Sequence, residues 1–381
     1  MSDSVYIPAC STGPPHAVVK QYLRGEGPRH GPEEWALNWW DKNPAIYHDT
    51  VLFSAYYKNQ LSHKARNLRE GIMARDDVKI YADSGGFQYL TMKAIPDPVE
   101  LIRWMDENVD YGFILDFPPM EMTTDDVKTA FVPAKDWRDR LKKTYEATKI
   151  MVNKRQRVPL YNVLHAEYPD MYEWYNTMKE FQLEGWAAGV QPFTPLKVAL
   201  RTAFFISEGI RDRVHIFGVG GVSTIPVLAY SAKWIKNLTF DNSSFAAGAI
   251  KRDYFLPFLY GERLRFGSRQ ELKVGQVTTT KELPCECNIC KYADGDRFRQ
   301  PDYIAGLLLE LHNVHVLVNY TKTMNMLVKN DEEAFLEMVK RRFGDKAWLS
   351  CMLVRTAAEE GFETSYRKWI ERGTENVSSW F

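Results

Sequence analysis

The chain has 381 residues and balanced charges, 49 Lys and Arg against 49 Asp and Glu. This balance excludes a strong overall field, so any binding to nucleic acid must use a local basic patch. Hydrophobic residues make up 45% of the chain and aromatic residues 13%, which is enough for a large core. The sequence shows no secretory leader and no apolar stretch of about 18 residues or more, so we expect a cytoplasmic protein with no membrane span.

Eight short runs rich in β-branched and aromatic residues recur along the chain, with amphipathic stretches between them. Apolar strands that alternate with helices indicate a parallel sheet covered on both faces. Eight strands fit a barrel better than an open doubly wound sheet, and no Gly-x-Gly-x-x-Gly motif opens the first helix. The predicted strands are 5–9, 51–57, 79–83, 111–116, 159–167, 185–190, 214–221 and 237–241, and the predicted helices between them include 97–108, 137–153, 171–183 and 225–236.

We therefore predict an α/β fold, a (β/α)8 TIM barrel with a zinc-binding subdomain and C-terminal helices. The barrel should span residues 1–275, the zinc-binding subdomain 276–330 and the C-terminal helical extension 331–381. The segment 25–47, rich in Trp, has the composition of an insertion or lid. Neither this segment nor the C-terminal extension carries residues with a recognisable chemistry.

Polar residues and glycines end several predicted strands, at the rim where barrel enzymes carry their active sites. These rim residues are Asp83, Asp116, His165, Gly189, Gly218 and Asp241. Three acids on one rim indicate function, because like charges held together are costly for a purely structural purpose. The alternative for Asp83 and Ser84 is a helix N-cap. Gly85 and Gly86 follow, and they allow positive φ or a close approach of the backbone to a flat ligand.

A cysteine cluster predicts a metal site. Cys285, Cys287 and Cys290 form a C-x-C-x-x-C motif, and His312 follows on a helix predicted over 303–327. Three thiolates and one imidazole make the closed tetrahedral set of structural zinc sites. Unpaired thiols at this spacing would be unusual, so we expect zinc. His315, one helical turn further on, is the alternative fourth ligand, and Cys10 and Cys351 are expected to be ordinary buried or half-buried residues.

Taken together, these motifs resemble the tRNA-guanine transglycosylase family from about residue 79 to residue 329. The family's DSGGFQ motif stands at 83–88, its GGL segment begins at Gly189-Val190, and its FD motif stands at 240–241. The family's zinc site is similar to the Cys3His set above. Three departures matter: the family's Arg-rich loop after FD is replaced by 242–250, which has no Arg, a family glutamine stands as His165, and the second glycine of the GGL segment stands as Val190.

The resemblance implies a base-exchange reaction on nucleic acid. Asp241 would attack the sugar and form a covalent glycosyl-enzyme, and Asp83 would be the general acid and base. Asp116 would bind the pairing edge of the base, which must leave the helical stack. The other residues implied to bind the substrate are Ser84, Gly86, Phe87, His165, Gly189, Val190, Phe217 and Gly218.

The missing Arg-rich loop favours the DNA-acting (DpdA-like) branch, which installs 7-deazaguanines such as 7-cyano-7-deazaguanine. A tRNA transglycosylase is one alternative, and a non-catalytic nucleic-acid-binding subunit on the same scaffold is another. Retention of Asp83 and Asp241 disfavours the second alternative. The implied cofactor is structural Zn2+, and the implied partners are DNA (or tRNA), the free base, a second copy in a homodimer, and a helicase-like protein.

Overall fold

The structure is a computed structural model. It describes the following residues: 2–9, 39–40, 44, 46–56, 67–71, 74–86, 95–125, 128–189, 194–219, 221–257, 262–266, 281–300 and 303–371. The chain divides into two compact units, one made of Met1–Ile7 with Val190–Phe381 and the other of Pro8–Gly189. Within the described parts, no helix is long and apolar enough to cross a membrane.

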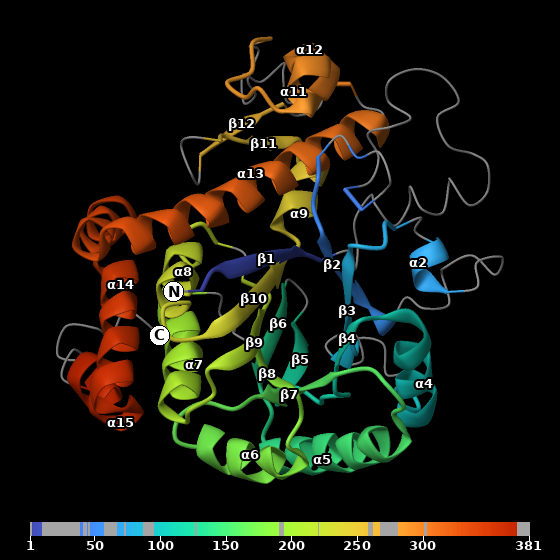
Figure 1. Cartoon of the computed structure of the whole chain (residues 1–381), viewed down its shortest axis with the longest axis vertical. Helices are drawn as coiled ribbons and strands as arrows, with labels where there is room; N and C mark the ends of the chain where they lie inside the picture. Colours follow the sequence, from blue (N-terminus) through green and yellow to red (C-terminus); the bar gives the residue numbers. More distant parts are fainter. Residues whose placement is uncertain are drawn as a thin grey trace. The chain divides into compact units, whose positions relative to one another are not determined.

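Eight strands form one sheet in the order β1-β10-β9-β8-β7-β4-β3-β2 (Figure 1). A parallel bridge between Ala9 and Leu52 brings the two ends of this order together, so the barrel is nearly closed. With its helices, this is the predicted (β/α)8 fold. The strands are β1 Ser4–Pro8, β2 Thr50–Ser54, β3 Lys79–Asp83, β4 Tyr111–Phe113, β7 Leu160–Leu164, β8 Gly185–Gly189, β9 Asp212–Phe217 and β10 Lys236–Asn242.

All eight predicted strands are present, and β3 has the predicted bounds. The strand β4 is shorter than predicted, since it ends at Phe113 and not at 116. Beyond it the backbone turns to side-chain partners: the Leu115 N–H donates to Met151 Sδ, and the Phe117 N–H to Thr144 Oγ1. Asp116 therefore lies on a loop and not on a strand.

The unit Pro8–Gly189 contains β2 to β8 and the helices between them. Asp97 begins α4 by accepting a hydrogen bond from the Val99 N–H, and Pro98 occupies the first helical position, where its missing N–H is not needed. The antiparallel hairpin of β5 and β6 was not predicted, and it precedes α5. The remaining bounds are α2 Leu68–Gly71, α4 Pro98–Asn108, β5 Met120–Asp125, β6 Lys128–Pro133, α5 Trp137–Lys154, α6 Met171–Met178 and η3 Lys179–Phe181.

The second unit contains β9, β10 and the C-terminal half of the chain. Its C-terminal helices pack on α7: the Ser207 hydroxyl donates to the Ala357 carbonyl, and the rings of Phe204 and Phe362 lie 5.6 Å apart (Figure 1). The extension thus covers the helical layer. The bounds are α7 Pro195–Ser207, α8 Ile225–Ser231, α9 Ser244–Ile250, β11 Asp253–Phe255, β12 Arg263–Arg265, α11 Asn288–Tyr292, α12 Gly295–Phe298, α13 Tyr303–Asn330, α14 Glu332–Glu360, α15 Phe362–Tyr366 and η4 Arg367–Glu371.

A buried carboxylate fixes the start of β7. Asp106, near the end of α4, is 7% exposed and accepts backbone hydrogen bonds from Gln156, Arg157 and Val158 at 2.8, 2.9 and 2.8 Å. These three N–H groups belong to the turn that leads from α5 into β7. Without the carboxylate they would be left unpaired, which costs free energy in a buried position.

We expect Asp106→Asn to lower the free energy of unfolding by about 1–3 kcal/mol, because one of the accepting oxygens becomes an amide nitrogen. The matched control is Asp97→Asn at the other end of α4, where Asn is as good an N-cap as Asp. Urea unfolding of both variants measures the difference. Equal stability of the two would show that Asp106 does not hold the turn.

Candidate active-site groups and metal centre

Asp116 has hydrogen-bond donors on both carboxylate oxygens. The Ser84 hydroxyl donates to Oδ1 at 2.9 Å, and His165 Nε2 lies 2.7 Å from Oδ2. Ser84 is completely buried, and the side chains of Asp116 and His165 are each 11% exposed. This group joins the ends of β3, β4 and β7 within one unit, and it brings together three of the residues predicted from sequence.

The packing around Asp116, Ser84 and His165 requires a glycine at position 86. A Cβ on Gly86 would lie 2.4 Å from the Asp116 carbonyl oxygen and 2.8 Å from its Oδ1, so no side chain fits there. Gly85 has φ +84°, and its Cβ would lie 2.9 Å from Tyr56 Cβ. The glycine pair thus lets the backbone pass close to Asp116. Since glycine alone adopts such conformations at little cost, the chain has no alternative residue at these positions.

Asp83 is the last residue of β3 and is partly buried. The next residue, Ser84, accepts a hydrogen bond from the Gly86 N–H at 3.3 Å while it donates to Asp116. The Ser84 hydroxyl thus both receives a backbone N–H and holds the Asp116 carboxylate. The segment from 87 onward, where the helix of the capping alternative would run, lies outside the described residues.

His165 is fixed by its neighbours. Its ring lies edge-on against Trp174, with ring centroids 5.1 Å apart, and the Trp174 indole N–H donates to the Val163 carbonyl. Gly189, at the end of β8, leaves space beside the imidazole: its Cβ would stand 3.7 Å from His165 Cε1 and 3.8 Å from Nδ1. Phe87 and Val190, also predicted to bind the substrate, lie outside the described residues.

Asp241, in the other unit, is held by one oxygen only. The Gly218 N–H donates to Oδ1 at 3.0 Å, and His215 Nε2 lies 3.1 Å from the same oxygen. Asp241 is 7% exposed. Among the described residues no donor lies on Oδ2. The carboxylate is therefore oriented by two contacts on Oδ1.

His215 is a residue that the sequence reasoning missed. It is completely buried on β9, and its Nδ1 lies 2.9 Å from Thr239 Oγ1. Its ring also contacts Phe217 edge-on, with centroids 4.6 Å apart. The available signal was a titratable residue in an apolar strand, two positions before the strand end. The neighbouring strand carries Thr239 opposite His215 in register, which sequence alone does not reveal.

A cavity of about 220 Å³ lies in the same unit as Asp241. The loop after β9 contributes Val222 and Ser223, Ser244 begins α9, and Phe255 belongs to β11. Further apolar lining comes from α13. The lining thus combines hydroxyls, the aromatic rings of Phe255 and Tyr320, and the charged side chains of Glu262 and Arg263, which suits a partly polar organic ligand.

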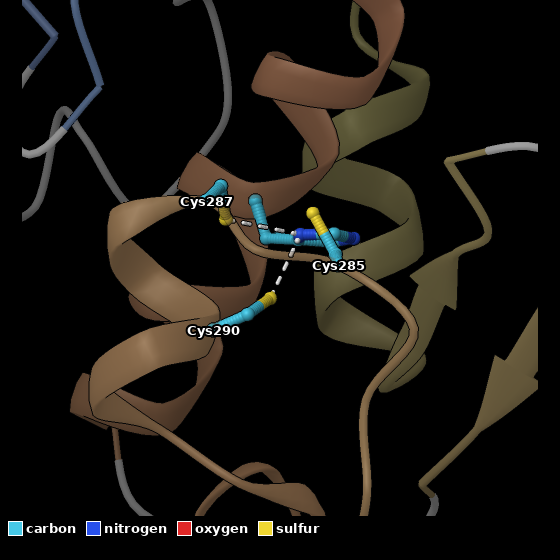
Figure 2. Close-up of side chains that lie close together, drawn as sticks. Cys285, Cys287 and Cys290 are labelled. Atoms are coloured by element: carbon cyan, nitrogen blue, oxygen red, sulfur yellow. Dashed lines mark hydrogen bonds between the residues drawn. The ribbon is translucent and has the colours of Figure 1, made fainter.

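The predicted metal ligands lie together. One ligand atom from each of Cys285, Cys287, Cys290 and His312 lies within 4.8 Å of the others, and Figure 2 shows the thiols around the imidazole. The distances from His312 Nδ1 to the sulfurs of Cys287 and Cys290 are 3.6 and 3.3 Å. Tetrahedral zinc with ordinary Zn–S and Zn–N bonds requires about 3.5 Å between such atoms. The donor set therefore fits zinc.

The surroundings of His312 set its tautomer for metal binding. Its Nε2 lies 2.8 Å from the Phe255 carbonyl oxygen, which can only accept, so Nε2 carries the proton and Nδ1 faces the thiols. The Tyr254 ring stacks on the imidazole at 3.8 Å, and its hydroxyl lies 3.4 Å from Cys290 Sγ. The next residue, Asn313, binds the backbone of α9 and β11.

Crowding of the thiols also points to a cation. Hydrogen bonds from Cys287 and Cys290 lower the pKa of Cys285. The hydrogen bond with Cys285 raises the pKa of Cys287 to about 11, and the same two neighbours raise the pKa of Cys290. The close packing of the three thiols thus opposes the ionisation of Cys287 and Cys290. A divalent metal replaces the remaining protons, which couples its binding to pH.

The alternative ligand His315 lies outside the cluster. Its Nε2 is 2.8 Å from Asn319 Nδ2. Cys351 is fully buried, as expected, and Cys10 lies outside the described residues. Arg263 and Arg265 form ion pairs with the buried Asp253 at 3.0 and 3.3 Å. Both remain about half exposed, so they stabilise the hairpin of β11 and β12 and still reach solvent.

No known protein-family model matches this chain, and no curated protein sequence matches it significantly.

We expect His312→Gln to abolish stoichiometric zinc binding and to lower the melting temperature, because a tetrahedral site that loses one of its four ligands binds zinc far more weakly. Elemental analysis of the purified chain measures the metal directly. His315→Gln is the matched control on the same helix and should keep the zinc of the parent. Loss of zinc in the control, or its retention in His312→Gln, would contradict the assigned ligand set.

Proposed function

We propose that this protein is a guanine transglycosylase that exchanges guanine in DNA for a 7-deazaguanine. The observation that carries the proposal is Asp241, a nearly buried carboxylate with two contacts on Oδ1 and none on Oδ2 among the described residues. A carboxylate nucleophile needs such an arrangement, one oxygen held in place and the other open to the sugar. The position of Asp241 on the last barrel strand adds to it, because barrel enzymes carry their chemistry at strand ends.

In the first step, Asp241 Oδ2 bonds to the anomeric carbon of the target nucleotide while the bond from that carbon to guanine breaks. Asp83 gives its proton to the departing guanine. In the second step, Asp83 takes a proton from the incoming base, whose nitrogen displaces the Asp241 carboxylate. Two displacements retain the configuration at the sugar, as in retaining glycosidases.

His215 and the Gly218 N–H serve both steps through Oδ1. They orient the carboxylate before attack, and they stabilise its negative charge when it leaves in the second step. A bound zinc ion would hold the segment with the three cysteines against α13 and would take no part in the chemistry.

DNA is favoured over tRNA by the segment that follows Asp241. It contains no Arg and forms the short helix α9, whose residues Phe245, Ala246 and Ala249 are buried. A tRNA-acting relative would carry an Arg-rich loop here. The orientation of the Asp241 carboxylate by His215 and the Gly218 N–H argues against the non-catalytic alternative, since a binding subunit needs no oriented nucleophile.

The proposal predicts that labelled guanine enters DNA that contains guanine, and that Asp241→Asn lowers the rate by at least about 10⁴-fold, as for other catalytic nucleophiles. Asp83→Asn should lower it by about 10²–10⁴-fold, the usual contribution of a general acid. The control is Asp139→Asn on the exposed face of α5, which should keep the parent rate.

The same assay run with tRNA separates the alternatives. Label in tRNA but not in DNA would select a tRNA transglycosylase. Label in neither polymer, together with retained binding of DNA, would select the non-catalytic subunit. Full activity of Asp241→Asn would remove the nucleophile from the scheme.

A further inference from the structure

Thr239 and Asp241 hold the imidazole of His215 from one face of β10. The two residues are two positions apart on this strand, so their side chains point to the same side. The register places His215 of β9 opposite Thr239. The imidazole lies between them, with Nδ1 2.9 Å from Thr239 Oγ1 and Nε2 3.1 Å from Asp241 Oδ1. Each ring nitrogen therefore contacts a side chain of the neighbouring strand.

Contact at both nitrogens selects one orientation of the ring. The last side-chain torsion of a histidine is broad and roughly two-fold, so packing alone leaves two orientations related by a half-turn. The half-turn would exchange Nδ1 and Nε2 for ring carbons, and Thr239 and Asp241 would lose their contacts to nitrogen. His215 is completely buried, so water could not replace these hydrogen bonds.

The Thr239 hydroxyl is itself held in place. Thr239 is 7% exposed, and its Oγ1 also lies 3.3 Å from the Val214 carbonyl oxygen on β9. A hydroxyl can donate or accept, so its contact with His215 Nδ1 persists whichever ring nitrogen carries the proton. The orientation of the imidazole thus depends on Thr239 and not on one protonation state.

We propose that Thr239 is a positioning residue for base exchange, because it keeps His215 in the orientation that places Nε2 on Asp241. This inference rests on the proposed function. Thr239 acts through His215 and needs no contact with the sugar or the base. A carboxylate nucleophile must meet the anomeric carbon in a near-attack geometry, and a displacement of about 1 Å can cost about 10²-fold in rate. Thr239 limits that displacement through the His215 contact on Oδ1.

The first test removes only the hydroxyl. Thr239→Val keeps the branched shape, and we expect kcat for the entry of labelled guanine into DNA to fall about 10–100-fold, with KM for DNA within about twofold of the parent. Thr239→Ser keeps the hydroxyl and should hold kcat within about threefold of the parent. A purely packing role would give the opposite order, because Val keeps the volume and Ser leaves a methyl-sized gap. That opposite order, or a parent-like kcat in Thr239→Val, would overturn the proposal.

A double variant tests whether Thr239 acts through His215. In a His215→Phe chain, Thr239→Val should lower kcat by less than about a further twofold, because the hydroxyl no longer has an imidazole to orient. Equal losses in the two backgrounds would show that Thr239 acts independently of His215, and they would contradict the proposal.

Nitrogen-15 spectra of the imidazoles follow the contact without turnover. The signals of His215 are identified by their absence in His215→Phe. We expect them to shift in Thr239→Val, which removes the group on Nδ1, and to keep their positions in Thr239→Ser. Unchanged signals in Thr239→Val would remove the contact on which the proposal stands.

The two kinds of measurement separate failure of the positioning role from failure of base exchange. A parent chain that exchanges guanine, with a Thr239→Val variant that matches its kcat, would refute the positioning role alone. A parent chain without exchange would refute the proposed function and the role of Thr239 with it, even where the His215 signals shift.

Discussion

A carboxylate that is withdrawn from water needs hydrogen-bond donors, and this requirement organises the described ends of the barrel strands. Asp106 takes three backbone N–H groups and becomes a purely structural clamp. Asp116 takes a hydroxyl and an imidazole, one on each oxygen. Asp241 takes a backbone N–H and an imidazole on the same oxygen. The three carboxylates are buried to a similar extent, but their hydrogen-bond donors are distributed differently over the two oxygens, so the three can play different roles.

The cluster of Cys285, Cys287, Cys290 and His312 is subject to a similar electrostatic constraint, which a bound cation would relieve. Three thiols in one place cannot all ionise without a cation, and the raised pKa values of Cys287 and Cys290 express this conflict. A metal ion would remove this conflict and would tie the cysteine segment to α13 through His312. The hydrogen bond from His312 to the Phe255 carbonyl connects the metal site to β11, and the same Phe255 lines the cavity.

The strands were predictable because each is a continuous apolar run that ends in polar or glycine residues. The ligand set of the metal was predictable because its spacing is local. Features that depend on contacts between distant segments of the chain were not predictable from the sequence. His215 contacts Thr239 and Asp241, which lie on the neighbouring strand. Asp116 lies on a loop because, after β4, the backbone N–H groups of Leu115 and Phe117 bond to the side chains of Met151 and Thr144 and not to a neighbouring strand. The hairpin of β5 and β6 also escaped prediction, because β5 (Met120–Asp125) is mostly polar and β6 (Lys128–Pro133) contains only a short apolar run.

In the proposed reaction, Asp241 bonds covalently to the sugar. Trypsin should release residues 237–251 as one peptide, in which Asp241 is the only acidic side chain. After a reaction with guanine-containing DNA is quenched by denaturation and trimmed with nuclease, mass spectrometry of this peptide tests the claim. We predict that the peptide carries the mass of a deoxyribose phosphate remnant. An adduct on a different peptide, or active turnover with no adduct on this one under a rapid quench, would contradict it.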